Sequence, residues 1–302
     1  QAYTAVKALS GEEERTELVG FTISRYGTGL KFANGSSPTI KNCHISLCNV
    51  IAELSPDNDI NLFDVTYSSN AEDFIILSGG TIGNTNNSVL REWNMSGISL
   101  YVSESIIIKS SQSSALASLK IIGDAVFAFE EGEGIIVGDP SNSDYRGSLE
   151  TNGPTFTVQE GDSLWSGIRF NNPSDDETSV INNSIIEYAT NGVSCFSSSP
   201  RIMGSNFRFN SEAINADASS SPLIKENNFT NNTYPVRYYG SKIDSTIYGN
   251  SYSNNMVENT STDYIFVQGS GSSYRLDQNK TYDWLNDGAP YRISNDLQVW
   301  ED

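Results

Sequence analysis

The sequence is poor in cysteine and histidine. It contains three cysteines, Cys43, Cys48 and Cys195, and one histidine, His44. An odd and sparse set of cysteines does not make a disulfide framework, and the step from Cys43 to Cys48 differs from the C-x2-C spacing of zinc sites. We therefore exclude a Cys/His metal cluster and expect the cysteines to be small, buried apolar residues.

Positive charge and long apolar runs are also scarce. The chain has 18 Lys and Arg against 37 Asp and Glu, a net charge of −19. Binding to nucleic acids and to anionic lipids depends on basic residues, so both classes of partner are excluded. No stretch approaches the ~18 apolar residues of a membrane span.

The chain begins at Gln1 without a signal peptide, so we expect a processed secreted protein or an excised segment, monomeric and extracellular or at the cell surface.

A short repeat dominates the C-terminal half of the sequence. Isoleucines stand at positions 181, 202, 224 and 247, in steps of 21, 22 and 23 residues. Each is followed five positions later by an apolar residue: Ile186, Phe207, Phe229 and Tyr252. A third apolar position comes seven residues further on in three of these units: Val193, Ile214 and Val236. Asn, Ser and Gly separate these short apolar segments, a pattern typical of strands and turns and incompatible with helices.

One such unit cannot bury its apolar residues alone, so the units must stack. The sequence therefore predicts an all-β fold, a right-handed parallel β-helix with about 22 residues per coil and irregular excursions between coils. At this period the chain would form about 13 coils if every segment coiled regularly. We expect a single β-helix domain over residues 1–302.

The turn positions of the repeat predict two further features. The position three after the leading isoleucine is small or an amide in these four units and in a similar N-terminal unit that begins at Ile40: Cys43, Ser184, Ser205, Asn227 and Asn250. Such side chains can hydrogen-bond along the stack as a polar ladder. Glu187 and Arg208 occupy equivalent positions one coil apart, which predicts a surface ion pair of small energetic value.

A longer repeat links the two ends of the chain, since residues 19–110 match residues 203–301. Within it, Trp93 and Gly97 align with Trp284 and Gly288. We therefore expect these tryptophans to be architectural, and the chain to be a piece of a longer tandem array of ~190-residue modules.

Segments 119–137, 147–153 and 163–170, followed by the regular coils, resemble bacterial surface and secreted proteins with right-handed parallel β-helix repeats, the pectate-lyase-like superfamily in the broad sense. The resemblance implies the fold for most of residues 19–302, but the superfamily includes lyases, hydrolases, epimerases and adhesins.

The catalytic motifs of the enzymes in this superfamily are missing here. The polygalacturonase Gly-His-Gly is absent, because His44 lies between Cys43 and Ile45, and Asp175-Asp176 is the one Asp-Asp pair. The Arg-x-Pro-x-x-Arg setting of pectate lyases and the Tyr-Gly-x-Asp-Pro-His signature of alginate epimerase modules are also absent. No catalytic set can therefore be transferred to this chain.

Carboxylates on adjacent coils could still hydrolyse or cleave a polysaccharide, because glycoside hydrolysis needs two of them about 5–10 Å apart. The candidates are Asp175, Asp176, Glu177, Glu187 and Glu212. Calcium binds clusters of oxygen ligands, and the candidate ligands are Asp57, Asp59, Asp175 and Asp176. The simpler interpretation of both sets is acidic loops on an acidic surface.

Tyrosines crowd the last coils, and aromatic rings beside polar side chains are typical of glycan sites. The candidates are Tyr234, Tyr238, Tyr239 and Tyr248. The sequence thus favours an extracellular β-solenoid with a structural, adhesive or glycan-binding role and no cofactor other than calcium. The alternative is a polysaccharide hydrolase or lyase that acts in a groove along one face. A net charge of −19 would favour a neutral glycan over a polyanion.

Overall fold

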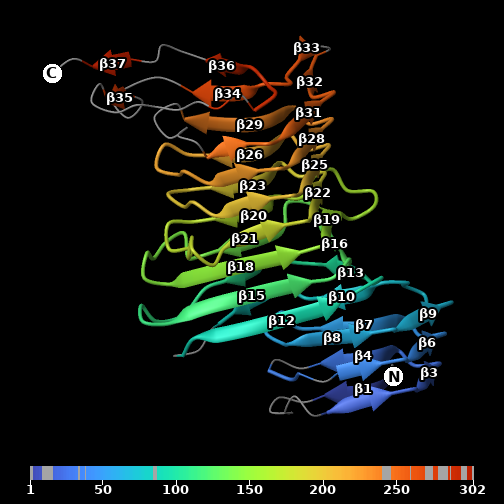
Figure 1. Ribbon diagram of the computed structural model, residues 1–302. Helices are drawn as coiled ribbons and strands as arrows, with labels where there is room; N and C mark the ends of the chain where they lie inside the picture. Colours follow the sequence, from blue (N-terminus) through green and yellow to red (C-terminus); the bar gives the residue numbers. More distant parts are fainter. Residues whose placement is uncertain are drawn as a thin grey trace.

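The computed structural model describes residues 3–8, 16–32, 35–37, 39–83, 87–239, 246–258, 260–268, 275–277, 285, 287–293 and 298–300. These residues form a stack of coils built from parallel strands, with no helix in the part described (Figure 1). The predicted parallel β-helix is confirmed. Among the same residues, no helix has the length and apolarity to cross a membrane.

Two long sheets, which we call A and B, run through the whole stack. Sheet A contains β1 (Thr4–Ala8), β4 (Thr28–Phe32), β7 (Val50–Leu54), β10 (Ile75–Leu77), β13 (Ser99–Val102), β16 (Val126–Phe129), β19 (Thr155–Val158), β22 (Ile185–Glu187), β25 (Asn206–Arg208), β28 (Asn228–Thr230) and β31 (Ser251–Ser253). Sheet B contains β2 (Glu17–Val19), β5 (Thr39–Lys41), β8 (Ile60–Phe63), β12 (Val89–Met95), β15 (Leu116–Ile122), β18 (Arg146–Asn152), β21 (Val180–Asn182), β24 (Arg201–Met203), β27 (Leu223–Lys225) and β30 (Ile247–Tyr248).

Two further sheets each cover part of the stack. Sheet C, near the N-terminus, contains β3 (Thr22–Ser24), β6 (His44–Ser46) and β9 (Thr66–Ser68). Sheet D contains β11 (Gly80–Ile82), β14 (Ile106–Ile108), β17 (Gly134–Val137), β20 (Gly167–Phe170), β23 (Asn191–Cys195), β26 (Glu212–Ala216), β29 (Tyr234–Tyr239), β34 (Ile265–Gln268) and β36 (Tyr291–Ile293). Near the C-terminus, β32 (Met256–Val257) pairs antiparallel with β33 (Thr260–Ser261), and β35 (Arg275–Asp277) pairs parallel with β37 (Gln298–Trp300).

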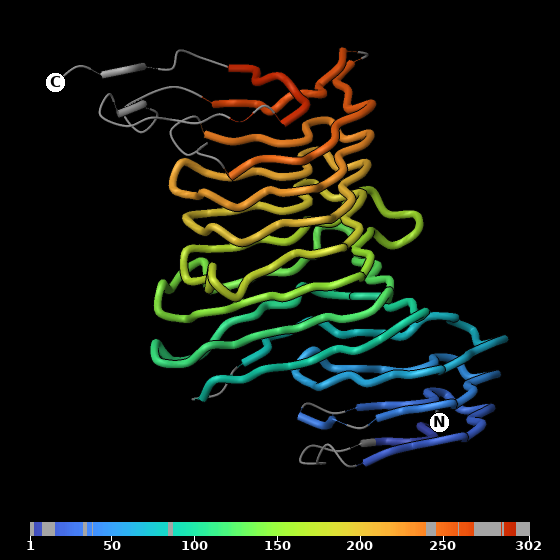
Figure 2. The backbone as a smooth tube through the Cα atoms, in the orientation of Figure 1, coloured from blue at the N-terminus to red at the C-terminus, as the bar shows by residue number. Residues whose placement is uncertain are grey.

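The stack slips sideways where sheet C ends and sheet D begins. The first coils pass through sheets B, C and A, whereas the coils from β12 onward pass through B, A and D. The coil between them has four strands, β8 to β11, and its strand β10 pairs with β13 above it. Figure 2 shows the blue N-terminal coils displaced from the green and yellow coils that follow.

The coils are longer on average than the sequence repeat predicts. Ile181 pairs with Ile202, 21 residues on, but Leu119 pairs with Leu149 and Ile135 with Ile168, 30 and 33 residues on. The mean spacing is roughly 25 residues and the chain makes about 10 turns, not 13. The difference arises because loops are inserted in the central coils, where the short repeat is not visible.

The interior is a column of stacked apolar side chains. In sheet A the inward aromatic rings of successive coils stack: Phe207 lies 5.2 Å from Phe229, and Phe229 lies 5.2 Å from Tyr252. Trp93 is fully buried and its indole N–H donates to the backbone carbonyl of Asn58 at 2.9 Å. This position agrees with the architectural role expected for Trp93, while its repeat partner Trp284 lies outside the described residues.

Polar ladders satisfy the turns inside this column. The predicted ladder is confirmed, since the backbone N–H groups of Ser184, Ser205 and Asn227 each donate to the side chain one coil on. A second ladder, not foreseen, runs through Asn210, Asn232 and Asn255. Both ladders end on an aspartate, Asp287 for the first and Asp263 for the second, which accepts the last N–H group at 2.8 and 2.9 Å.

The three cysteines, Cys43, Cys48 and Cys195, are free and buried, as expected. Burial also raises the pKa of the Cys195 thiol, because the thiolate is poorly solvated there. We expect all three thiols to resist a thiol-specific reagent in the native protein and to react after unfolding in denaturant. A spectrophotometric count of released chromophore checks this, and fast labelling of the native chain would contradict it.

Candidate functional site

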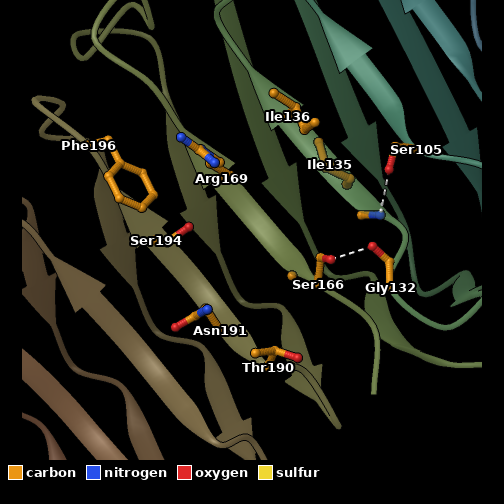
Figure 3. Close-up of a pocket in the computed structure, with 12 residues that line it drawn as sticks. Ser105, Gly132, Ile135, Ile136, Ser166, Arg169, Thr190, Asn191, Ser194 and Phe196 are labelled. Atoms are coloured by element: carbon orange, nitrogen blue, oxygen red, sulfur yellow. Dashed lines mark hydrogen bonds between the residues drawn. The ribbon is translucent and has the colours of Figure 1, made fainter. Parts of the chain in front are cut away.

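A shallow groove lies on the outer face of sheet D, across strands β17, β20 and β23 (Figure 3). It encloses about 310 Å³. Its lining consists mainly of glycines, hydroxyl and amide side chains, and one aromatic ring: Ser105, Gly132, Gly134, Ile135, Ile136, Ser166, Gly167, Arg169, Thr190, Asn191, Ser194 and Phe196.

Glycines at the starts of β17 and β20 make the close coil packing beneath the groove possible. Gly167 has a φ of +98°, and a Cβ atom added there would overlap the carbonyl oxygen of Asn191 in the next coil. At Gly134, an added Cβ would meet the carbonyl oxygen of Gly167. Only glycine allows the backbones to approach this closely. At these two positions no side chain covers the backbone of the sheet.

One end of the groove presents polar side chains. Ser166 donates a hydrogen bond to the carbonyl of Gly132, while the Ser105 hydroxyl accepts one from the Gly134 N–H at 3.1 Å. In contrast, the side chains of Thr190, Asn191 and Ser194 have no hydrogen-bond partner among the described residues. Thr190 is exposed and Asn191 is half-buried, so both side chains are available to a ligand, whereas Ser194 is only 7% exposed.

The other end is formed by a stacked aromatic–arginine pair. Phe196 directly follows β23 and is 40% exposed. The guanidinium of Arg169 lies 4.3 Å from the centre of its ring, and Arg169 Nε donates to Asn171 Oδ1 at 2.8 Å. Arg169 pairs with no carboxylate in the described part of the chain, and stacking fixes its position instead.

A second hollow of about 400 Å³ adjoins the groove and shares Arg169 and Phe196 with it. Asp139 lies in this hollow and accepts a hydrogen bond from Lys109 Nζ at 2.7 Å. The hydrogen bonds from Lys109 and from the Ser141 N–H lower the pKa of Asp139, so this carboxyl group is ionised and already engaged.

The five carboxylates predicted for catalysis lie outside the groove lining, and all but Glu177 are engaged in ion pairs or hydrogen bonds through their side chains. Asp175 pairs with Arg146, Glu187 with Arg208, and Glu212 with Arg237. The Glu187–Arg208 pair was predicted from the repeat and is confirmed.

Asp176 accepts hydrogen bonds from the Ser198 hydroxyl at 3.0 Å and the Ser199 N–H at 2.8 Å, so it closes a turn of the stack. Glu177 is exposed, and its backbone carbonyl accepts a hydrogen bond from Arg201 at 3.1 Å.

The carboxylates predicted to bind calcium near the N-terminus face an arginine. Arg91 Nε lies 3.0 Å from Asp57 Oδ1, and its Nη1 lies 3.9 Å from Asp59 Oδ2. Asp59 also accepts the Ser37 hydroxyl at 3.2 Å. Calcium would have to displace the guanidinium, and within the described ranges no three His, Cys, Asp or Glu side chains are grouped as metal ligands.

The predicted tyrosines do not form one surface. Tyr238 is fully buried, where burial raises its pKa, and its hydroxyl lies 3.5 Å from Thr246 Oγ1. Its ring therefore belongs to the core and cannot contact a glycan. Tyr234 and Tyr239 are half-buried in sheet D, whereas Tyr248 is half-buried in sheet B, beneath Lys225.

The groove itself was not predicted from the sequence. The available signal was weak: Arg169 is a charged residue within a strand of the longer, irregular coils, and Phe196 follows the last residue of β23. The period of those coils is hidden by loops, so the sequence does not show that these residues lie side by side.

Comparison with protein-family models, curated proteins and solved structures gives no match.

Proposed function

We propose that the protein is a secreted or cell-surface β-solenoid, of the kind seen in pectate-lyase-like surface proteins, that binds a glycan in the groove on sheet D. The observation that carries the proposal is the exposed Phe196 ring, held by Arg169 beside the unpartnered side chains of Thr190, Asn191 and Ser194. An aromatic face packs against the apolar face of a sugar, while hydroxyl and amide groups bind its hydroxyls.

Binding without turnover, and so an adhesive role, is supported by the chemistry of the lining. No carboxylate is among the lining residues of the groove. Among those that adjoin it, Glu133 accepts a hydrogen bond from the Ser105 hydroxyl, and Asp139 is paired with Lys109. A neutral glycan suits the strongly acidic chain, since a polyanion would be repelled over most of its surface.

The test is a panel of neutral and uronic oligosaccharides, with and without calcium, assayed by calorimetry and by release of reducing ends or unsaturated products. We expect a neutral glycan to bind without turnover, and Phe196→Ala and Arg169→Ala each to weaken it about tenfold, equivalent to ~1.4 kcal/mol. The control is Phe21→Ala, which removes a ring 55% exposed on the N-terminal coils.

Melting curves of all three variants show whether the fold is intact. If no glycan binds, or if Phe21→Ala weakens binding as much as Phe196→Ala, the groove is not the site. New reducing ends or unsaturated sugars would instead establish the enzymatic alternative.

A further inference from the structure

Two exposed aromatic residues form a corner near the polar end of the groove. Tyr188 and Phe209 occupy the same position in successive coils, in the turn that joins sheet A to sheet D. Their rings stack with centres 5.1 Å apart and planes 9° apart. The side chains are 40% and 41% exposed, so the pair presents a continuous apolar face to solvent.

The backbone at this corner is poorly suited to these residues. Tyr188 and Phe209 have φ angles of +55° and +58°, in the left-handed region that bulky side chains rarely adopt. The next two coils have Asn231 and Asn254 at the same position, with φ angles of +56° and +57°. Asparagine accepts this conformation more easily, so the aromatic pair costs stability that asparagine would not.

Neither core packing nor charge explains the aromatic pair. The rings project outward, and the ionic groups beside them, Glu187 and Arg208, neutralise each other. An uncharged ligand with a flat apolar face matches such a surface, and a pyranose ring has this character.

The corner is held in a fixed position relative to the groove. The backbone carbonyl of Tyr188 accepts a hydrogen bond from the backbone N–H of Trp165 at 3.2 Å. The backbone N–H of Thr190 donates to the backbone carbonyl of Trp165 at 2.8 Å. Thr190 lines the groove, two residues beyond Tyr188. An exposed aromatic residue therefore stands near each end of β23, Tyr188 before the strand and Phe196 after it.

From this arrangement we infer that Tyr188 and Phe209 form a second stacking subsite for the same neutral oligosaccharide. Its chain runs along β23 from Phe196, past Asn191 and Thr190, onto the corner. At the ~3.3 Å rise of a parallel strand, positions 188 to 196 span at most about 26 Å, so only an extended oligosaccharide reaches both platforms. This inference rests on the glycan-binding function proposed for the groove.

The test uses the double variant Tyr188→Asn/Phe209→Asn and two lengths of the oligosaccharide that binds best in the panel. We expect affinity for the long oligosaccharide to fall at least tenfold, and affinity for a short fragment that fills the groove alone to stay unchanged. The denaturation midpoint of the same variant should rise, because the backbone strain relieved at two positions outweighs the single ring stack that is lost.

The matched control is Leu47→Asn. Leu47 has a φ of +55° and is 52% exposed in the turn after β6, away from the groove. It should raise the midpoint in the same way and leave the affinity for both oligosaccharides unchanged.

Unchanged affinity of the double variant for the long oligosaccharide, with Phe196→Ala still weakening binding, would overturn the corner subsite and leave the groove in place. A lower midpoint for the double variant would overturn the strain argument. Absence of any glycan binding by the native chain would overturn the groove and the corner together.

Discussion

Replacing Gly167 by alanine is expected to lower the free energy of unfolding by about 2–6 kcal/mol. The left-handed φ of +98° is strained for any residue with a Cβ atom, at a cost of about 1–3 kcal/mol. In addition, the new Cβ would overlap the Asn191 carbonyl oxygen and lie 2.7 Å from the carbonyl carbon. Separating these backbones costs a further ~1–3 kcal/mol, because coils in a tight stack cannot move independently. Equilibrium denaturation in urea measures the loss.

Gly161 provides the matched control, since its φ is +97° but nothing lies within 4 Å of an added Cβ. Gly161→Ala therefore carries only the strain of the φ angle, about 1–3 kcal/mol. Equal losses for the two variants would mean that the close approach at Gly167 adds nothing.

A loss of similar size is expected when the second polar ladder is interrupted by Asn232→Ala. The Asn232 side chain accepts the backbone N–H of Asn210 at 3.0 Å and donates to the backbone carbonyl of Phe207 at 2.9 Å. Asn232 is 1% exposed, so water cannot replace it. Each buried group left unpaired costs about 1–3 kcal/mol, so the two backbone groups together account for about 2–6 kcal/mol.

Asn206→Ala is the control. Asn206 is also an asparagine of the stacked coils, in strand β25 of sheet A, but its side chain points to solvent and lies outside the ladder. Its replacement should change the free energy of unfolding by no more than about 0.5 kcal/mol. If the two variants have the same midpoint in denaturant, the ladder does not contribute as argued.

The parts of the fold that could be predicted from sequence are those with a strict period. Ile181, Ile202 and Ile224 recur at nearly constant spacing because each fills the same position of the core, and Ser205 and Asn227 recur because each bonds to its equivalent. Once the period is known, adding one period to a residue number gives its neighbour in the next coil, as for Glu187 and Arg208.

The groove and the slip could not be predicted because both depend on coils of irregular length. The coils from β12 to β20 carry loops of different sizes, so Arg169 and Phe196 are not brought into register by any constant shift of the sequence. The acidic and tyrosine-rich segments attracted attention by composition alone. Composition does not distinguish an ion-paired carboxylate such as Glu212, or a buried ring such as Tyr238, from a free one.

We expect the sideways slip to divide the stack into two cooperative blocks. In a solenoid each coil is stabilised by its neighbours, and the coupling between them grows with the strand pairings that they share. At the slip, only sheets A and B continue, because sheet C ends at β9 and sheet D begins at β11. The N-terminal coils can therefore open as a unit while sheet D stays folded. A ligand held on sheet D stabilises the C-terminal block by mass action and leaves the opening of the N-terminal block unchanged.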